Sequence, residues 1–147
     1  MGEWNLPNAT PAYFGSLATD LDGVICEDCP SIVEGNENDY LNWIQNARHY
    51  LIPAHEVYAI VTCRLEKYRT LTEAWLKENN VKYQNLVMWN LPEKKLRTSA
   101  GFVQHKINAL LRLKPVWYWE SSIMEAIAIW EATKIPILCI DEMKMFC

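Results

Sequence analysis

The chain has 147 residues, of which 50% are hydrophobic and 22% charged, with only 5 glycines and 7 prolines. This composition excludes disordered and collagen-like sequence, and the length predicts one domain with one hydrophobic core. Eighteen acidic residues against 14 lysines and arginines give a formal charge of −4, which argues against a protein that binds duplex nucleic acid by neutralising its phosphates.

Targeting and redox signals point to the cytoplasm. No apolar run approaches the roughly 18 residues that a membrane span needs, and residues 1–13 lack the basic and apolar pattern of a signal peptide. Five cysteines is an odd number, which favours free thiols in a reducing compartment over a disulfide framework. We therefore expect a cytoplasmic protein without a membrane segment.

Short apolar runs follow one another along most of the chain. They are continuous rather than alternating, which is typical of strands covered on both faces. In chain order the five predicted strands span residues 16–22, 56–62, 85–89, 115–119 and 135–140.

Segments with helical spacing separate these runs. The four predicted helices span residues 39–49, 66–79, 103–113 and 121–132. Strands that alternate with helices imply right-handed βαβ units and a parallel sheet. The prediction is an α/β fold with five strands, in a single domain over residues 16–147 that follows a lead-in of residues 1–15.

Polar residues end three of the predicted strands. Asp20 and Asp22 end the first strand, Thr62 ends the second and Glu120 ends the fourth. Ligands of an open parallel sheet bind beyond the carboxyl ends of its strands, so these side chains are expected at one edge. Lys106, expected at the start of the helix before the fourth strand, would join them.

Phosphoryl transfer through an aspartyl phosphate needs such a set. Asp20 would attack phosphorus, and Asp22 would protonate the leaving alkoxide and then deprotonate the attacking water. Thr62 would donate a hydrogen bond to a phosphate oxygen, and Lys106 would neutralise developing charge. Gly23 would let the chain turn sharply beside the substrate.

A hard cation would complete this chemistry. Mg²⁺ would be held by Asp20, the backbone carbonyl of Asp22 and Glu120, relieving repulsion between phosphate and carboxylates.

Two arginines follow Thr62. Arg64 and Arg69 could bind a second anionic group of the substrate, because guanidinium fits phosphate well. Surface salt bridges with Glu66 or Glu73 are the alternative.

The order of these motifs resembles the haloacid-dehalogenase-like hydrolases. DxDGV, a strand-terminal threonine, a lysine and then an acidic residue after a fourth strand carry the resemblance, over residues 16–141. Residues 60–69 (IVTCRLEKYR), 72–76 (TEAWL) and 119–121 (WES) are similar to a subgroup fused to, or encoded beside, phosphoribosyltransferases. The resemblance implies a three-layer Rossmann-like sheet, Mg²⁺-dependent phosphatase activity and a phosphoribosyltransferase as a partner.

The fourth motif departs from the family pattern. Aspartate is usual there, whereas this chain has Glu120, followed five positions later by Glu125. Glu125 matches one family spacing for a second acid, and a solvated helix position is the alternative.

The segment between the first two strands is where this family inserts cap domains. Residues 24–55 contain one predicted helix and a polar tip, which is too little for a full cap. We therefore expect an uncapped or minimally covered site. Cys26 and Cys29 lie on this segment and Cys63 follows Thr62, so free thiols near the site are expected, with a regulatory disulfide or soft metal site as the alternative.

Three functions remain open at this point. The first is a Mg²⁺-dependent phosphatase of a small phosphomonoester, such as a nucleotide or phosphoribosylated metabolite. The second is a nucleic-acid 3′-end phosphatase, with a basic patch at Lys94, Lys95 and Arg97, although these residues also suit a solvated loop. The third is a non-catalytic binding or regulatory module, which only Glu120 favours.

Overall fold

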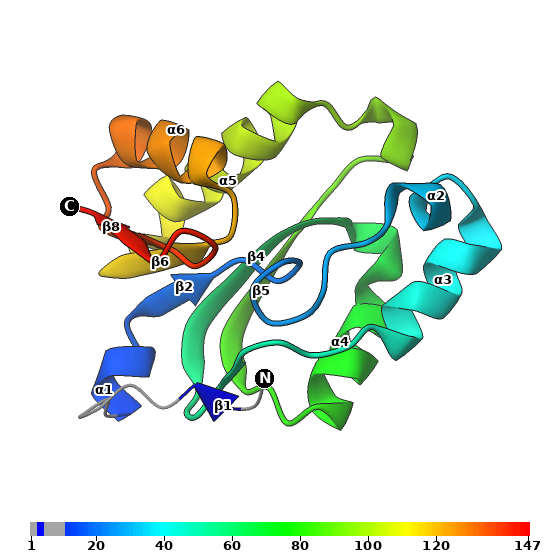
Figure 1. Cartoon of the computed structure of the whole chain (residues 1–147), viewed down its shortest axis with the longest axis horizontal. Coiled ribbons are helices and arrows are strands. Elements are labelled where there is room, and N and C mark those ends of the chain that lie inside the picture. The colour runs from blue at the N-terminus through cyan, green and yellow to red at the C-terminus, as the bar shows by residue number, and fades with distance from the viewer. Residues whose placement is uncertain (1–2, 5–10) are drawn as a thin grey trace.

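The computed structural model describes residues 3–4 and 11–147, and side chains from residue 13 onward. Its centre is a six-stranded sheet with the strand order β5-β4-β2-β6-β7-β8 (Figure 1). The strands of this sheet are β2 (Leu17–Thr19), β4 (Val57–Leu65), β5 (Tyr83–Trp89), β6 (Trp117–Glu120), β7 (Ile137–Cys139) and β8 (Lys144–Phe146). A separate parallel pair joins β1 (Glu3–Trp4) and β3 (Ile52–Pro53).

The five predicted strands are all present in the large sheet and pair in parallel. The predicted number of strands is wrong, because β8 adds a sixth strand that runs antiparallel to β7. β8 has three residues and follows a tight turn with a positive φ of 48° at Met143. So short an edge strand leaves no apolar run that would reveal it in the sequence.

Helices cover both faces of the sheet, with α3 and α4 on one side and α5 and α6 on the other (Figure 1). The α-helices are α1 (Pro11–Phe14), α2 (Ser31–Glu34), α3 (Glu37–Asn46), α4 (Arg69–Glu78), α5 (Ser99–Leu113) and α6 (Ile123–Thr133). Two 3₁₀ turns, η1 (Glu66–Tyr68) and η2 (Lys94–Leu96), precede α4 and α5. Helix α5 begins earlier than predicted because the Thr98 side chain accepts a hydrogen bond from the backbone N–H of Gly101 and caps it.

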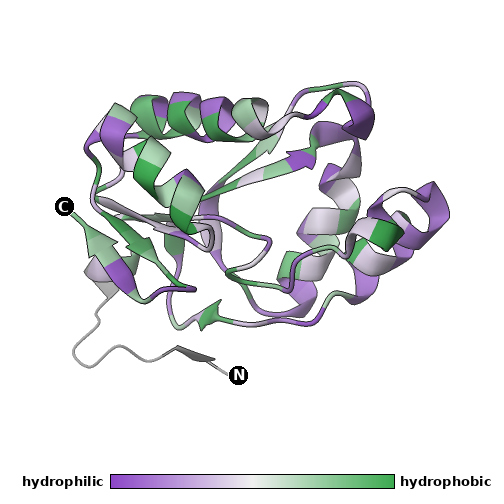
Figure 2. Cartoon of the chain, turned by 45° about the horizontal axis from the view of Figure 1, so that its top comes forward, coloured by the Kyte–Doolittle hydropathy of each residue, from purple (hydrophilic) through white to green (hydrophobic). Residues whose placement is uncertain are grey.

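Alternate residues of each strand supply two separate cores. Leu17 and Ile60 point to the α3 and α4 side, where Trp75 is buried. Ala18 and its neighbours face α5 and α6, where Leu110 is buried. Since successive side chains of a strand point to opposite faces, burial on both sides explains the continuously apolar strands (Figure 2). The fold is a three-layer, Rossmann-like α/β arrangement.

The segment between β2 and β4 contains α2, α3 and β3. Helix α3 is fixed by buried Tyr40, Trp43 and Ile44, and the Trp75 indole of α4 donates to the Ala47 carbonyl at 2.8 Å. Its polar tip, residues 34–39, is hydrophilic (Figure 2). The segment therefore contains two helices and a short strand, where a single helix was predicted.

The predicted lead-in of residues 1–15 lies partly outside the described residues. Within the described residues, no helix is long and apolar enough to cross a membrane.

Candidate active site

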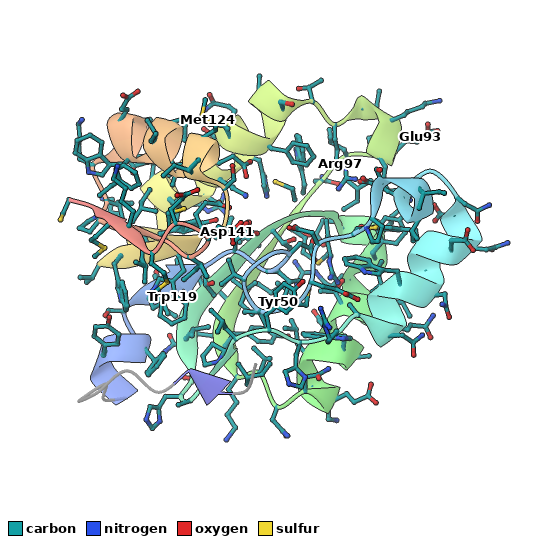
Figure 3. The ribbon with its side chains drawn as sticks, in the orientation of Figure 1. Tyr50, Glu93, Arg97, Trp119, Met124 and Asp141 are labelled. Atoms are coloured by element: carbon teal, nitrogen blue, oxygen red, sulfur yellow. The ribbon has the colours of Figure 1, made fainter. Side chains whose placement is uncertain are left out.

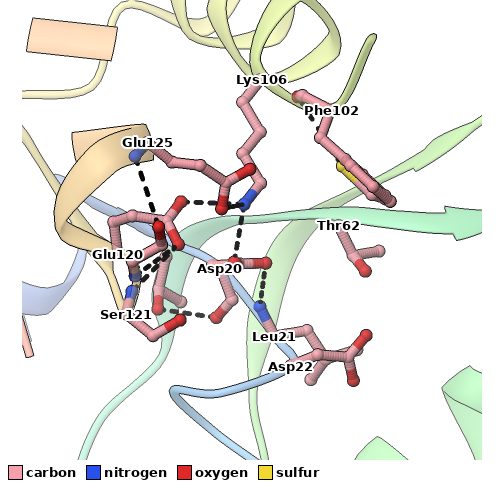
Figure 4. Close-up of polar contacts among 12 residues, drawn as sticks. Asp20, Leu21, Asp22, Thr62, Phe102, Lys106, Glu120, Ser121 and Glu125 are labelled. Atoms are coloured by element: carbon pink, nitrogen blue, oxygen red, sulfur yellow. Dashed lines mark hydrogen bonds and ion pairs between the residues drawn. The ribbon is translucent and has the colours of Figure 1, made fainter. Parts of the chain in front are cut away.

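A cavity of about 510 Å³ lies at the carboxyl ends of the central strands. Asp20 is the first residue after β2 and lines this cavity. Asp22, two residues later, lines it too. Two of the other predicted residues, Lys106 and Glu120, approach Asp20 from α5 and from the end of β6 (Figure 4). The parallel topology therefore brings together residues that lie up to 100 positions apart in the sequence.

Lys106 is the centre of this group. Its Nζ donates to Asp20 Oδ2 at 2.8 Å, to Glu120 Oε2 at 2.8 Å and to Glu125 Oε2 at 3.3 Å (Figure 4). Lys106 lies in the middle of α5 and not at its start, which corrects the predicted helix position. Burial opposes its charge, but Asp20, Tyr118 and the glutamates around it raise its pKa well above the usual value. The lysine is therefore held cationic beside Asp20.

Asp20 is 5% exposed and firmly oriented. Its Oδ1 accepts a hydrogen bond from the backbone N–H of Leu21 at 2.7 Å, while Lys106 binds Oδ2. Burial raises the pKa of Asp20 well above its ordinary value, Lys106 opposes this effect, and the negative charge of Glu120 adds to it. The positive charge of Lys106 at this position therefore favours the ionised form of Asp20.

Asp22 is bound by Arg64 through both carboxylate oxygens. Arg64 Nη2 lies 2.6 Å from Asp22 Oδ1, and its Nε lies 3.1 Å from each oxygen. Arg64 itself is 1% exposed, lies inside β4 and packs against the Trp43 ring at 4.8 Å. It does not line the cavity, so the structure places this predicted substrate-binding residue behind Asp22 instead.

Arg69 makes the surface contacts that were the alternative to substrate binding. Its guanidinium pairs with Glu66 at 2.8 Å and Glu73 at 3.2 Å, and it also donates to the Leu86 carbonyl. Arg69 does not line the cavity either. A second anionic group of a substrate bound there would have to find another cation.

Thr62 lies within β4 rather than at its end, and its side chain is fully buried. Its Oγ1 accepts a hydrogen bond from the backbone N–H of Arg64 at 3.1 Å. The pairing of β4 with β5 shifts register between Val61 and Leu65, and Cys63 in this irregular stretch lines the cavity. The irregularity changes which side chains of β4 face the cavity. The sequence pattern therefore predicted Thr62 as the cavity residue, whereas Cys63 lines the cavity.

Gly23 holds the loop after β2 close to the end of β6. Its φ is +86°, and a Cβ at this position would lie 2.6 Å from the Ser121 Oγ. Both the conformation and the space require glycine here. Gly23 therefore shapes the loop that carries Asp22.

Glu120 is fully buried and its oxygens are already bound within the protein. Oε1 accepts from the backbone N–H of Ser121 at 2.9 Å, and Oε2 accepts from Lys106 and from the Tyr118 hydroxyl at 3.1 Å. Glu120 does not line the cavity, whereas Glu125 does. In this arrangement Glu120 positions Lys106, and Glu125 is the glutamate with access to a ligand.

The cavity is strongly acidic. Seven of its lining residues are acidic, against the two cations Arg97 and Lys106. Asp28 and Asp141 are among the acids and had no signal in the sequence beyond their charge. Burial raises the pKa of Asp28, Glu125 and Asp141, and neighbouring carboxylates raise each of them further.

Crowded carboxylates of this kind suit a hard divalent cation, because it relieves their repulsion and prefers oxygen ligands. The donor chemistry of the cavity therefore fits Mg²⁺, with the exception of Glu120, which does not line the cavity and whose oxygens are already bound by Lys106, Tyr118 and the backbone. In their present positions, no three His, Cys, Asp or Glu side chains of the described residues are grouped closely enough to hold a metal ion.

Two of the three basic residues in the polar run before α5 are not solvated. The Lys94 side chain is 14% exposed and lies 3.6 Å from the centre of the Tyr40 ring, and the Arg97 side chain is 9% exposed. Only Lys95, at 77%, matches the expected solvated loop. Arg97, which the sequence suggested only as part of a basic patch or a solvated loop, lines the cavity, and its charge alone did not reveal this burial.

All five cysteines are free thiols. Cys29 and Cys63 line the cavity, and Cys26 is buried with its thiol 3.2 Å from Asp22 Oδ1. This arrangement confirms the prediction of free thiols near the site.

Comparisons with known proteins give a likeness in fold. No family model and no curated protein matches the chain. Among solved structures, it is similar to a chain of the Pnkp1/Rnl/Hen1 RNA repair complex, with a TM-score of 0.54 and 15% sequence identity. The likeness covers 84% of this chain and 41% of that one, so this chain spans less than half of its length. At this identity the comparison shows a shared α/β fold.

Proposed function

We propose that this chain is a Mg²⁺-dependent phosphohydrolase of the haloacid-dehalogenase-like class, which cleaves a phosphomonoester through an aspartyl phosphate. The observation that carries the proposal is the environment of Asp20. A buried carboxylate at the end of a central strand is bound by a buried lysine, and a second aspartate two residues later lines the same cavity. The motif order in the sequence supports the same chemistry.

In the first step an oxygen of Asp20 attacks phosphorus, and the bond from phosphorus to the leaving oxygen breaks. Asp22 donates its proton to that oxygen. Lys106 stays bound to Asp20 and offsets charge on the transferring group.

In the second step Asp22 takes a proton from water, and the water oxygen attacks the phosphorus of the aspartyl phosphate. The bond between phosphorus and Asp20 then breaks, which releases inorganic phosphate and restores both aspartates. Arg64 positions Asp22, through the two-oxygen contact in the ionised form and through the remaining acceptor oxygen while Asp22 carries the proton.

Asp20, the backbone carbonyl of Asp22 and Glu125 are the groups we assign to the cation. Glu125 replaces Glu120 in this role because it lines the cavity. A bound Mg²⁺ would supply positive charge that offsets repulsion between the phosphate and the surrounding carboxylates.

Phosphate release from a panel of phosphomonoesters, with and without Mg²⁺, tests the proposal directly. We expect release that requires Mg²⁺ and that falls by about a thousandfold or more in Asp20→Asn, since an amide is a far weaker nucleophile. The variant should still unfold cooperatively, because the change is isosteric, although at a lower temperature, since buried Lys106 loses a charged partner at 2.8 Å. Full activity in Asp20→Asn would exclude the aspartyl phosphate route.

A nucleic-acid end phosphatase is the second candidate. The cavity adjoins Lys94, Lys95 and Arg97, and the structurally similar chain belongs to an RNA repair complex. Including oligonucleotides with a terminal phosphate in the panel separates this candidate from a phosphatase of small metabolites.

A further inference from the structure

Arg97 is anchored at the rim of the proposed active site, between η2 and α5 (Figure 3). Its Nη1 donates to the Cys63 carbonyl of β4 at 3.1 Å, and its Nη2 forms an ion pair with Glu34 of α2. The guanidinium lies 5.3 Å from the centre of the Phe102 ring. Among the described residues, its buried Nε–H finds no hydrogen-bond acceptor. Arg97 is therefore fixed in place with its Nε–H unused.

This arginine separates two cavities. A second cavity of about 620 Å³ lies beside the first, and Glu34, Arg97 and Phe102 line both. The side chains of Lys67, Lys94 and Lys95 line the second cavity as well. A substrate that reaches past the site around Asp20 in this direction would meet Arg97 first.

The charges of the first cavity leave Arg97 as the cation available to a substrate anion. Lys106 is already bound to three carboxylates, and the other lining charges are negative. Glu34 now occupies one edge of the Arg97 guanidinium. Two oxygens of a phosphate monoester or diester fit the paired N–H groups of a guanidinium, and a monoester also carries more charge than a carboxylate, so phosphate competes well with Glu34.

Glu34 can leave without disturbing the core. Helix α2 has four residues and none of them is buried, and Ile32 within it is 86% exposed. The Glu34 side chain itself is 37% exposed. Once Glu34 moves aside, the Arg97 Nη2 loses its carboxylate partner, although Glu37 and Glu93 also line the second cavity.

We propose that Arg97 binds a second phosphate group, carried on the leaving-group side of the substrate, and that this phosphate displaces Glu34. The inference rests on the proposed function, and it narrows the substrates to phosphomonoesters that bear another phosphate. Such a group comes either from a small bisphosphate or from the phosphodiester beside the terminal phosphate of an oligonucleotide.

Binding to a chain that cannot turn over tests this inference. In the Asp20→Asn background, calorimetry would compare adenosine 3′-phosphate, adenosine 3′,5′-bisphosphate and a tetranucleotide with a 3′-phosphate, all with Mg²⁺. We expect the ligands with a second phosphate to bind about tenfold or more tightly than the monophosphate, as for a charge-assisted contact. Adding Arg97→Gln should remove this difference and leave monophosphate binding within about twofold.

Three further variants refine the test. Glu34→Gln should strengthen binding of the bisphosphate several-fold, because the competing carboxylate loses its charge. Arg97→Lys should retain part of the preference, since it keeps the charge and loses the fork. Arg69→Gln is the matched control, because Arg69 also pairs with glutamates but lines neither cavity, and it should change nothing.

Equal affinity for monophosphate and bisphosphate in the parent chain would overturn the inference. Equal loss of both ligands in Arg97→Gln and Arg97→Lys, with unchanged thermal unfolding, would overturn it too. Absence of phosphate release with an intact Arg97-dependent preference would reject the hydrolase and retain the anion site. Lys95→Gln distinguishes the small bisphosphate from the oligonucleotide as the source of the second phosphate. If this variant weakens binding of the tetranucleotide and not of the bisphosphate, the oligonucleotide is the ligand.

Discussion

At the scale of single residues, the division of work between Asp20 and Asp22 follows from their partners. Both aspartates line the cavity, but Asp20 is buried and bound to a lysine, whereas Asp22 is more exposed and bound to an arginine. The two carboxylates differ by two positions in the sequence and occupy quite different surroundings. Their proposed roles as nucleophile and proton carrier depend on this difference.

Asp22→Asn should slow the cleavage of an alkyl phosphate much more than that of p-nitrophenyl phosphate. An amide cannot donate the proton that an alkoxide needs, whereas p-nitrophenolate leaves without one. Steady-state rates on the two substrates measure the effect. An equal loss on both substrates would show that Asp22 acts in some other way.

Glu125→Gln should raise the Mg²⁺ concentration needed for half-maximal stabilisation in thermal unfolding, because a ligand oxygen loses its charge. Glu120→Gln is the matched comparison. It should leave the Mg²⁺ requirement nearly unchanged and lower the melting temperature, since buried Lys106 loses a charged partner at 2.8 Å. If Glu120→Gln raised the Mg²⁺ requirement and Glu125→Gln did not, Glu120 would be the metal ligand, as the sequence motif predicts.

At the scale of elements, the loop after β2 is held against the end of β6. Gly23 at φ +86° approaches Ser121 closely, and the Arg64 side chain of β4 holds Asp22 from the other side. Three strands thereby fix the conformation of one loop. The site depends on their register as much as on its own residues.

Gly23→Ala should destabilise the fold by about 1–3 kcal/mol and reduce phosphate release, because alanine disfavours this φ and its Cβ would meet Ser121 at 2.6 Å. Gly35→Ala is the control. Gly35 has a φ of −73° and no atom within 4 Å of its would-be Cβ, so its replacement should be neutral or slightly stabilising. Denaturant unfolding measures both, and equal stability of the two variants would contradict the close approach.

At the scale of the whole molecule, each of the two cores contains one buried thiol, Cys26 in one and Cys139 in the other. Cys26 and Cys139 are fully buried, Cys63 is nearly so, and Cys147 is exposed. Burial raises the pKa of the thiols of Cys26, Cys63 and Cys139, and it raises that of Cys29 to about 11. At pH 8 these groups are thiols, and the thiolate is the form that reacts.

Iodoacetamide at pH 8 should therefore modify Cys147 first, Cys29 and cavity-lining Cys63 slowly, and Cys26 and Cys139 only after unfolding. Mass spectrometry of timed samples follows the order of modification. Rapid alkylation of Cys26 in folded protein would show that the loop after β2 opens. Replacing Cys26 and Cys29 by serine should leave phosphate release within a few-fold of the parent, since serine can still donate to Asp22.

The sequence by itself determined the five parallel strands, the helices between them and the edge at which Asp20, Asp22 and Glu120 end their strands. Apolar runs and helical spacing are local patterns, and parallel strands bring their carboxyl ends together whatever the details of packing. The order of residues along the chain also predicted that Lys106 joins this site, but it did not predict that Lys106 lies in the middle of α5.

The tertiary structure alone decided which charges meet. Arg64 faces Asp22 across 42 positions of sequence, and Arg97 pairs with Glu34 and a carbonyl of β4. The irregularity in β4 and the antiparallel β8 are likewise absent from the sequence pattern. Burial and long-range contacts set these partners, because a charged side chain looks the same in the sequence whether water or a carboxylate surrounds it.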